Sequence, residues 1–318
     1  MESPDGVRLL MKVARLYHAR GLRQVEIAAR LRLSQPRVSR LLKQAEELGV
    51  VRNVVAVPPG LHGDLEEALV RRFGLRAAHV LDVATADDGE LAHDLGHAAA
   101  AIFHADVTSA RTIGFTSWSR TLRHMVGALT PLDAGTERVV ETLGDLGPPT
   151  LQQDTAHLTQ RLATLTGGRP AFLRVPGVVS SPAIREALLA QDPHARAALG
   201  LLDALDVTLM GVGPCAIVAP LRSGDNYFTE AQFDDACRRG AVGQICLRFL
   251  GADGEPVATP LDDLVIGVTA AQLRRAGDRW VVGGGASKHA ILHAALVGGW
   301  VDRLVTDTAT AGYLLADR

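Results

Sequence analysis

From about residue 76 onward, short apolar runs rich in β-branched residues alternate with stretches of helical pattern. This alternation predicts βαβ units, which build an α/β fold with a mainly parallel sheet covered by helices on both faces. Ligands of such folds bind beyond the carboxyl ends of the strands, so the residues that follow each strand are the first candidates for a site. The expected strands are 77–83, 111–115, 137–144, 207–213, 281–285 and 303–307, and the clearest helices are 90–105, 119–129 and 287–299.

A smaller N-terminal segment differs from the rest of the chain in charge. Residues 1–57 hold eleven Lys and Arg against five Asp and Glu, a net charge of +6, whereas the remainder holds 22 basic and 30 acidic residues, a net charge of −8. A basic head on an acidic body favours contact of the head alone with a polyanion. The apolar run 53–57 predicts a short strand or wing, and PPGLHG at 58–63 breaks regular structure before a helix at 64–75. We therefore expect two domains, 1–57 and 58–318.

The basic head contains three helical patterns, at 7–20, 24–31 and 35–49. Ser34 is a good N-cap for the third helix, and Pro36 suits its first turn because the missing N–H is not needed there. A short helix, a tight turn and a second helix form the helix-turn-helix arrangement. The residues expected to face inward are Val7, Leu10, Met11, Ala14 and Tyr17 in the first helix, Val25, Ile27, Ala28 and Leu31 in the second, and Val38, Leu41, Leu42 and Ala45 in the third.

Two arginines, Arg37 and Arg40, lie close to the start of the third helix. The helix dipole disfavours cations there by ~0.3–1 kcal/mol. A DNA partner explains them, because the second helix of this motif enters the major groove, where a bidentate base contact gives ~1–3 kcal/mol of discrimination. The alternative is a small helical bundle with a solvated basic face. The predicted DNA-binding residues are Gln24, Ser34, Gln35, Arg37, Ser39, Arg40 and Lys43, with Gln35 and Arg37 expected at base edges.

Three strand ends of the body carry residues suited to a ligand. Residues 113–122, IGFTSWSRTL, place hydroxyls and Arg120 where a helix begins, which suits an anion or sugar oxygens, although ordinary helix caps have the same pattern. Residues 209–214, LMGVGP, let a ligand approach the backbone but lack the dinucleotide fingerprint. Residues 281–292, VVGGGASKHAIL, place Lys288 in the first turn of a helix after three glycines. That lysine opposes the helix dipole, so an anion site is expected there, a solvated lysine being the alternative.

Several classes of protein are disfavoured by what the chain lacks. The three cysteines, Cys215, Cys237 and Cys246, form no CxxC pair, so neither a disulfide framework nor a cysteine zinc site is expected. The pairs His93/His97 and His289/His293 have helical spacing but no identified third ligand, so no metal or other cofactor is expected. There is no signal pattern at the start and no apolar run approaching ~18 residues. These features together predict a soluble cytoplasmic protein.

The segment AARLRLSQPRVSRLLKQA closely resembles the helix-turn-helix of bacterial SorC/DeoR-type regulators, which respond to sugars. The body resembles the sugar-binding domain of the same family at IGFTSWSRTL, VVETLGDLG, DVTLMGVGP, GAVGQICLRFLGADGEPV, VIGVTAAQLRR and VVGGGASKHAILHAALVGGWVDRLVTDTATAGYLL. The match runs in the same order through nearly the whole chain. It implies an effector domain similar to sugar-phosphate isomerases and deaminases such as glucosamine-6-phosphate deaminase, which binds sugars, usually phosphorylated, between strand ends.

The resemblance also implies which residues hold the effector. The hydroxyl loop and Lys288 become its anchors, and in some relatives the matching lysine can form an imine with an open-chain sugar. Two positions depart from the family pattern: Gln244 stands where an acid is common, and Ser119 where a glycine is common. Both departures affect which sugar fits. The predicted effector-binding residues are Thr116, Ser117, Ser119, Arg120, Thr121, Gly213, Gln244, Gly284 and Lys288.

Residues and resemblance together predict a sequence-specific DNA-binding regulator of carbohydrate metabolism, in the form of a repressor. Its partners would be double-stranded operator DNA, a phosphorylated sugar or related metabolite, and further copies of itself in a dimer or tetramer, with no membrane contact. The main alternative is a sugar-phosphate isomerase or deaminase with an appended helical domain, which would need an acid–base pair among Asp145, Asp225 and Asp307. A third possibility makes the head a protein-interaction bundle. We expect the regulator and no enzymatic activity.

Overall fold

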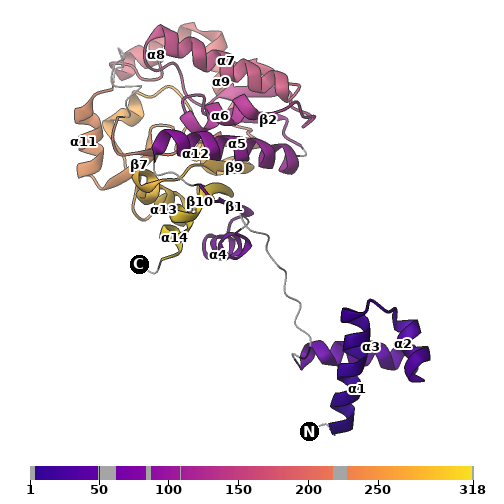
Figure 1. Cartoon of the computed structure of the whole chain (residues 1–318). Coiled ribbons are helices and arrows are strands. Elements are labelled where there is room, and N and C mark those ends of the chain that lie inside the picture. Colours follow the sequence, from indigo (N-terminus) through magenta and orange to yellow (C-terminus); the bar gives the residue numbers. More distant parts are fainter. Residues whose placement is uncertain are drawn as a thin grey trace. The chain divides into compact units, whose positions relative to one another are not determined.

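The computed structural model describes residues 4–48, 50, 62–83, 87–107, 109–217 and 228–316. The chain divides into two compact units, Met1–Pro58 and Pro59–Arg318 (Figure 1). The strand or wing expected at 53–57 lies outside the described residues. Within the described ranges, no helix combines the length and the apolar composition that a bilayer crossing needs.

The N-terminal unit is helical. Helix α1 spans Pro4–Ala14 and continues as one π-helical turn, Arg15–Ala19, before α2 at Gln24–Leu31 and α3 at Gln35–Glu47. The first helix begins three residues earlier than predicted, because proline suits a first helical turn. The second and third helices start where the sequence predicted them. A turn of three residues, 32–34, joins α2 to α3.

Three residues expected inside this unit are exposed: Met11 (48%), Tyr17 (38%) and Val25 (61%). The buried face of the first helix consists of Leu10, Val13, Ala14 and Leu16, so it already excludes Met11 before the π-helical turn begins. The buried residues are Leu10, Val13, Ala14, Leu16, Ile27, Ala28, Val38, Leu42 and Ala45, with Leu41 packed partly against them.

The larger unit is built on a seven-stranded sheet, which confirms the predicted α/β fold. Its order is β1-β10-β9-β5-β2-β3-β4, and every neighbouring pair is parallel. The expectation missed β4, which has only three residues and contains a proline. The strands are β1 Ala77–Leu81, β2 Thr112–Phe115, β3 Arg138–Glu141, β4 Arg169–Ala171, β5 Val207–Met210, β9 Asp278–Val282 and β10 Arg303–Asp307.

Successive residues on the central strands enter two different cores. Trp280 and Val282 pack in one cluster with α5, α6 and α7, whereas Val281 packs in the other with α4, α9, α13 and α14. This alternation follows from the two-residue period of a strand. Helices therefore cover both faces, as Figure 1 shows. The helices are α4 Gly63–Phe73, α5 Asp88–Asp106, α6 Arg120–Ala128, α7 Pro149–Leu165, α8 Pro182–Gln191, α9 Pro193–Leu201, α12 Ala270–Arg275, α13 His289–Val297 and α14 Thr308–Leu315.

A second, antiparallel sheet of three strands stands apart from the first. It consists of β6 Gly213–Pro214, β7 Ala241–Ile245 and β8 Arg248–Gly251, with helix α11 at Glu230–Arg238 beside it. The glycine in β7 and the shortness of β6 kept these strands from being predicted. The turn between β7 and β8 consists of residues 246 and 247.

The cysteine spacing predicted no disulfides, and this prediction is wrong. The structure joins Cys215, which follows β6, to Cys237 in the last turn of α11, with Cα atoms 6.1 Å apart. The two cysteines are 22 positions apart in sequence, so no short motif signals the pairing. The small sheet brings them together. Cys246 is free and buried.

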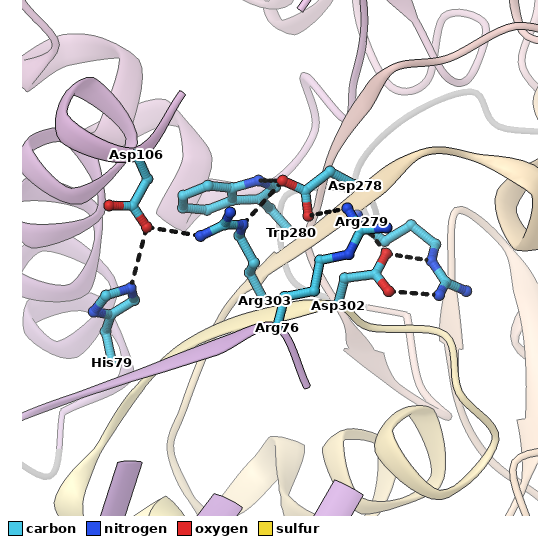
Figure 2. Close-up of polar contacts among 8 residues, drawn as sticks. All are labelled: Arg76, His79, Asp106, Asp278, Arg279, Trp280, Asp302 and Arg303. Atoms are coloured by element: carbon cyan, nitrogen blue, oxygen red, sulfur yellow. Dashed lines mark hydrogen bonds and ion pairs between the residues drawn. The ribbon is translucent and has the colours of Figure 1, made fainter. Parts of the chain in front are cut away.

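An ionic network ties strands β1, β9 and β10 together at their amino ends (Figure 2). Arg303 bonds Asp106 at 2.8 Å and Asp278 at 2.9 Å, and its guanidinium lies 5.0 Å from the centre of the Trp280 ring. Arg279 makes a two-pronged contact with Asp302 at 2.7 and 2.8 Å. The carboxyl ends of the same strands lie at the other edge of the sheet and carry none of this network.

Replacing Arg303 with alanine should lower the free energy of unfolding by about 2–3 kcal/mol, because two partly buried carboxylates lose their partner. Urea denaturation measures this. Arg275→Ala is the matched control: its contact with Asp203 is between side chains that are 59% and 63% exposed, so its loss should cost at most ~0.5 kcal/mol. Equal losses in the two variants would contradict a structural role for the network.

Candidate functional site

One cavity opens at the carboxyl edge of the sheet, where the strand order reverses. From β2 the chain adds β3 and β4 on one side, and then β5 and β9 on the other. In open α/β sheets this reversal separates the loops and leaves a crevice. The cavity has a volume of about 160 Å³. Its described lining consists of Thr116, Trp118, Ser119, Arg120, Leu143, Leu146, Gly211, Val212, Gly213, Pro214, Gln244, Cys246, Leu247 and Lys288.

The loop after β2 forms one wall of the cavity. The backbone N–H of Thr116 donates to the carbonyl of Leu209 at 3.1 Å, which extends the β2–β5 pairing into the loop. Ser119 then caps α6, its hydroxyl accepting from the N–H of Leu122 at 3.4 Å. A β-carbon on Gly211 would lie 2.6 Å from the Ser119 hydroxyl oxygen. Glycine is therefore required at 211 for the two loops to meet, and Arg120 begins its helix at the cavity.

Lys288 enters the cavity from the loop after β9. The residues Ala286–Lys288 form a 3₁₀ turn directly before α13, so the lysine precedes the α-helix instead of lying in its first turn. The carboxylate of Asp307 holds the glycine loop, accepting from the N–H of Gly285 at 3.0 Å. A β-carbon on Gly284 would lie 1.9 Å from an Asp307 oxygen. Only glycine fits there, and the close contact fixes where the lysine emerges.

Two cations share this cavity, and their electrostatics favour an anion. Burial lowers the pKa of the Lys288 ammonium below its usual 10.5; nearby Asp88 raises it, and Arg120 lowers it further. Asp88 accepts a hydrogen bond from the Ser287 hydroxyl at 3.0 Å and does not line the cavity. No carboxylate occurs among the described lining residues. A bound anion would therefore relieve both the repulsion and the loss of solvation.

The apolar side of the cavity is formed by the hairpin between β7 and β8 and by the residues after β3. Leu143, Leu146 and Leu247 are buried in one apolar cluster, with Trp118 packed against it. Gln244 supplies the one side-chain amide in the described lining, and its oxygen accepts from the N–H of Leu247 at 2.9 Å. The cavity thus offers a cationic region, hydroxyls, an amide and an apolar wall.

Six of the nine predicted effector-binding residues line this cavity: Thr116, Ser119, Arg120, Gly213, Gln244 and Lys288. The other three do not. Ser117 and Thr121 are each 2% exposed and lie outside the lining. Gly284 lies against Asp307 and is not part of the lining. Sequence reasoning missed the apolar lining, because leucine and tryptophan in such runs have the same pattern as core residues.

The acidic residues that an enzyme would need are engaged elsewhere. Asp145 contacts Arg174 at 3.0 Å; burial raises its pKa to about 6 although Arg174 lowers it, and Glu141 adds to the rise. Asp307 caps α14 through the N–H of Thr310 at 2.7 Å. Neither lines the cavity, and Asp225 lies outside the described residues.

The histidine pairs have neighbours of their own. The His93 and His97 rings lie 4.2 Å apart, and the His124 ring lies 5.1 Å from that of His93. His289 is 3.2 Å from the Thr310 hydroxyl and stacks on Tyr313. In the part of the chain that the structure describes, no group of three or more His, Cys, Asp or Glu is placed to hold a metal ion.

In the N-terminal unit, α3 turns its polar residues outward. Ser34, Gln35, Arg37, Ser39, Arg40 and Lys43 are exposed, and Gln24 at the start of α2 is partly buried. Arg32 ends α2 in the left-handed region, with φ of 52°, and its N–H bonds the carbonyls of Ala28 and Ala29. Sequence reasoning missed this exposed arginine, because its position suggested an ordinary turn. Arg32, Arg37, Arg40 and Lys43 are therefore all exposed on the turn and on α3.

Comparison with known proteins gives consistent matches over the whole chain. The Sugar-bind family model, which describes a sugar-binding domain, matches residues 59–316. The sorbitol operon regulator of Klebsiella pneumoniae is 30% identical, covering 99% of this chain and 100% of that protein. The deoxyribonucleoside regulator of Bacillus subtilis is also 30% identical, covering 98% of each. The crystal structure of the full-length regulator SorC from Klebsiella pneumoniae superposes with a TM-score of 0.72 at 29% identity, covering 99% of this chain and 100% of that one.

The paired cations predict pH-dependent binding of inorganic phosphate. As the pH rises through the lowered pKa of Lys288, the ammonium loses its proton and affinity should fall, whereas Lys288→Arg should keep its affinity because arginine stays charged. Calorimetric titrations from about pH 7.5 toward 10 measure this. At the lower end of this range Lys288→Ala should weaken binding about tenfold or more, and the difference from the wild type should shrink as the lysine loses its charge. Parallel pH profiles for the wild type and Lys288→Arg would place the anion away from this lysine.

Proposed function

The chain belongs to the SorC/DeoR-type family of sugar-binding transcriptional regulators, and from this premise we propose that its body binds a phosphorylated sugar that controls DNA binding by its head. Its relatives make it a carbohydrate-sensing transcriptional regulator. In this proposal residues 1–57 form the DNA-binding domain and residues 58–318 the effector domain. The effector shifts the balance between arrangements that hold operator DNA and arrangements that do not.

One observation carries the choice of effector: Arg120 and Lys288 share a small cavity whose described lining has no carboxylate. A sugar phosphate carries about two negative charges and several acceptor oxygens at neutral pH, which suits two cations beside the hydroxyls of Thr116 and Ser119. Gln244 offers an amide to a sugar hydroxyl. We assign Lys288 to the phosphate; an imine between its amine and an open-chain sugar is the alternative that the lowered pKa also permits.

The head is assigned to the major groove of operator DNA. Gln35 and Arg37 would contact bases, and Ser34, Ser39, Arg40, Lys43 and Gln24 would contact the backbone or flanking bases. We add Arg32 to the backbone contacts, because it is exposed beside them. Operators of this type are two-fold, so a dimer or tetramer is required. The protein would act as a repressor in the bacterial cytoplasm and release its operator when the sugar binds.

We propose that the body binds its sugar without converting it. The relatives are regulators, and the candidate acids Asp145 and Asp307 are occupied by Arg174 and by the loops around α14. A general acid and base near the sugar would be needed for isomerisation or deamination. Turnover of any phosphorylated hexose or pentose by the purified protein would overturn this part of the proposal.

Arg37→Ala should weaken binding to a duplex selected from a random library by ~1–3 kcal/mol, and it should relax the sequence preference at one base pair. Fluorescence anisotropy over a series of salt concentrations measures both affinity and salt dependence. Arg37→Lys separates two roles, because lysine keeps the charge but loses the two-pronged contact with guanine. If lysine restores full affinity and preference, Arg37 contacts only phosphate. If neither variant changes binding, α3 is not the reading helix.

A further inference from the structure

The hairpin turn between β7 and β8 has an uncommon backbone. Its two residues, Cys246 and Leu247, both have positive φ, at 51° and 59°. Two successive left-handed residues form the mirror-image turn that matches the twist of a two-residue hairpin, and glycine and asparagine are the usual occupants. Cysteine and leucine clash with their own backbone there. The described part of the chain has only one other non-glycine residue at positive φ, Arg32.

The side chains at this turn explain why glycine is absent. Both are 4% exposed, and both line the cavity. The Cys246 sulfur lies 3.3 Å from the Thr116 hydroxyl oxygen, on the loop that begins α6. Burial raises the pKa of the Cys246 thiol, which keeps it neutral. Leu247 joins Leu143 in the apolar cluster at the cavity. An Asn-Gly turn would relax the backbone but would leave this wall open.

We propose that the turn formed by Cys246 and Leu247 determines which sugar the cavity accepts. It packs against a C–H face of the ligand and rejects sugars that place a hydroxyl there, because such a hydroxyl would be buried without a partner. Strained backbone conformations persist where the surrounding structure and function require them. This inference rests on the proposed function, since it concerns the sugar end of the same cavity.

In this proposal, different elements contact the anionic group and the sugar of the ligand. Arg120 and Lys288, from the loops after β2 and β9, hold the anion whichever sugar bears it. The β7–β8 turn contacts the sugar alone. Inorganic phosphate has no sugar, so its affinity should depend on the two cations and not on the turn. This difference separates a specificity role from general damage to the site.

Leu247→Asn tests the inference, because asparagine accepts the left-handed backbone while replacing the apolar wall with an amide. Calorimetry would measure the Kd of inorganic phosphate, ribose 5-phosphate, 2-deoxyribose 5-phosphate, glucose 6-phosphate, fructose 6-phosphate and fructose 1,6-bisphosphate. We expect the ratio between the two tightest sugar phosphates of the wild type to change at least tenfold. The Kd of inorganic phosphate should stay within twofold.

Leu250→Ala is the matched control. Leu250 is 1% exposed on β8 and is not in the cavity lining, so its variant should lose thermal stability and keep the wild-type ratio. If Leu247→Asn does not fold, Leu247→Gly, which also fits the backbone, is judged by the same ratio. An unchanged ratio in a folded variant overturns the inference. A wild type that binds neither inorganic phosphate nor any of these sugar phosphates contradicts the proposed function instead.

Discussion

The candidate site of the body depends on holding two cations, Arg120 and Lys288, in one small cavity. Like charges placed together out of water repel and lose solvation, so rigid surroundings must hold them. Gly211 lets the β5 loop touch the cap of α6, and Asp307 clamps the glycine loop that carries the lysine. Asp88 offsets part of the charge from outside the cavity. A bound anion offsets the remaining repulsion and loss of solvation at the two cations. If the anion binds more tightly to one arrangement of the protein, its binding favours that arrangement.

The central framework of the fold was predictable because its signals are local. Alternating apolar runs predicted six strands of the parallel sheet, and the loops after β2 and β9 were identified because hydroxyls, glycines and a lysine stood at strand ends. The small sheet was missed, since β6 has two residues and β7 contains a glycine. The Cys215–Cys237 pair was missed because only tertiary structure brings its halves together. Tyr17 was placed inside because several apolar residues of the first helix fit a helical spacing, and the structure buries Leu10, Val13, Ala14 and Leu16.

The candidate site was predicted in its polar half and missed in its apolar half. Charged and hydroxyl residues at a strand end indicate a ligand, whereas Leu143 and Leu247 have the same pattern as any core leucine. Only the positive φ angles of residues 246 and 247 distinguish this turn from an ordinary core segment. The three non-glycine residues at positive φ in the described chain, Arg32, Cys246 and Leu247, all lie in regions assigned to binding. Residues that disfavour their own backbone conformation therefore lie at the proposed binding sites.

The central claim is that sugar binding in the body and DNA binding in the head are linked. Linkage is reciprocal, so the factor by which a sugar phosphate changes operator affinity must equal the factor by which operator DNA changes sugar-phosphate affinity. The most direct test measures both factors on one preparation of the full chain, using a duplex selected from a random library and the tightest-binding sugar phosphate. We predict equal factors of about 5- to 150-fold, with each ligand weakening the other. A factor of one in both directions would contradict the claim.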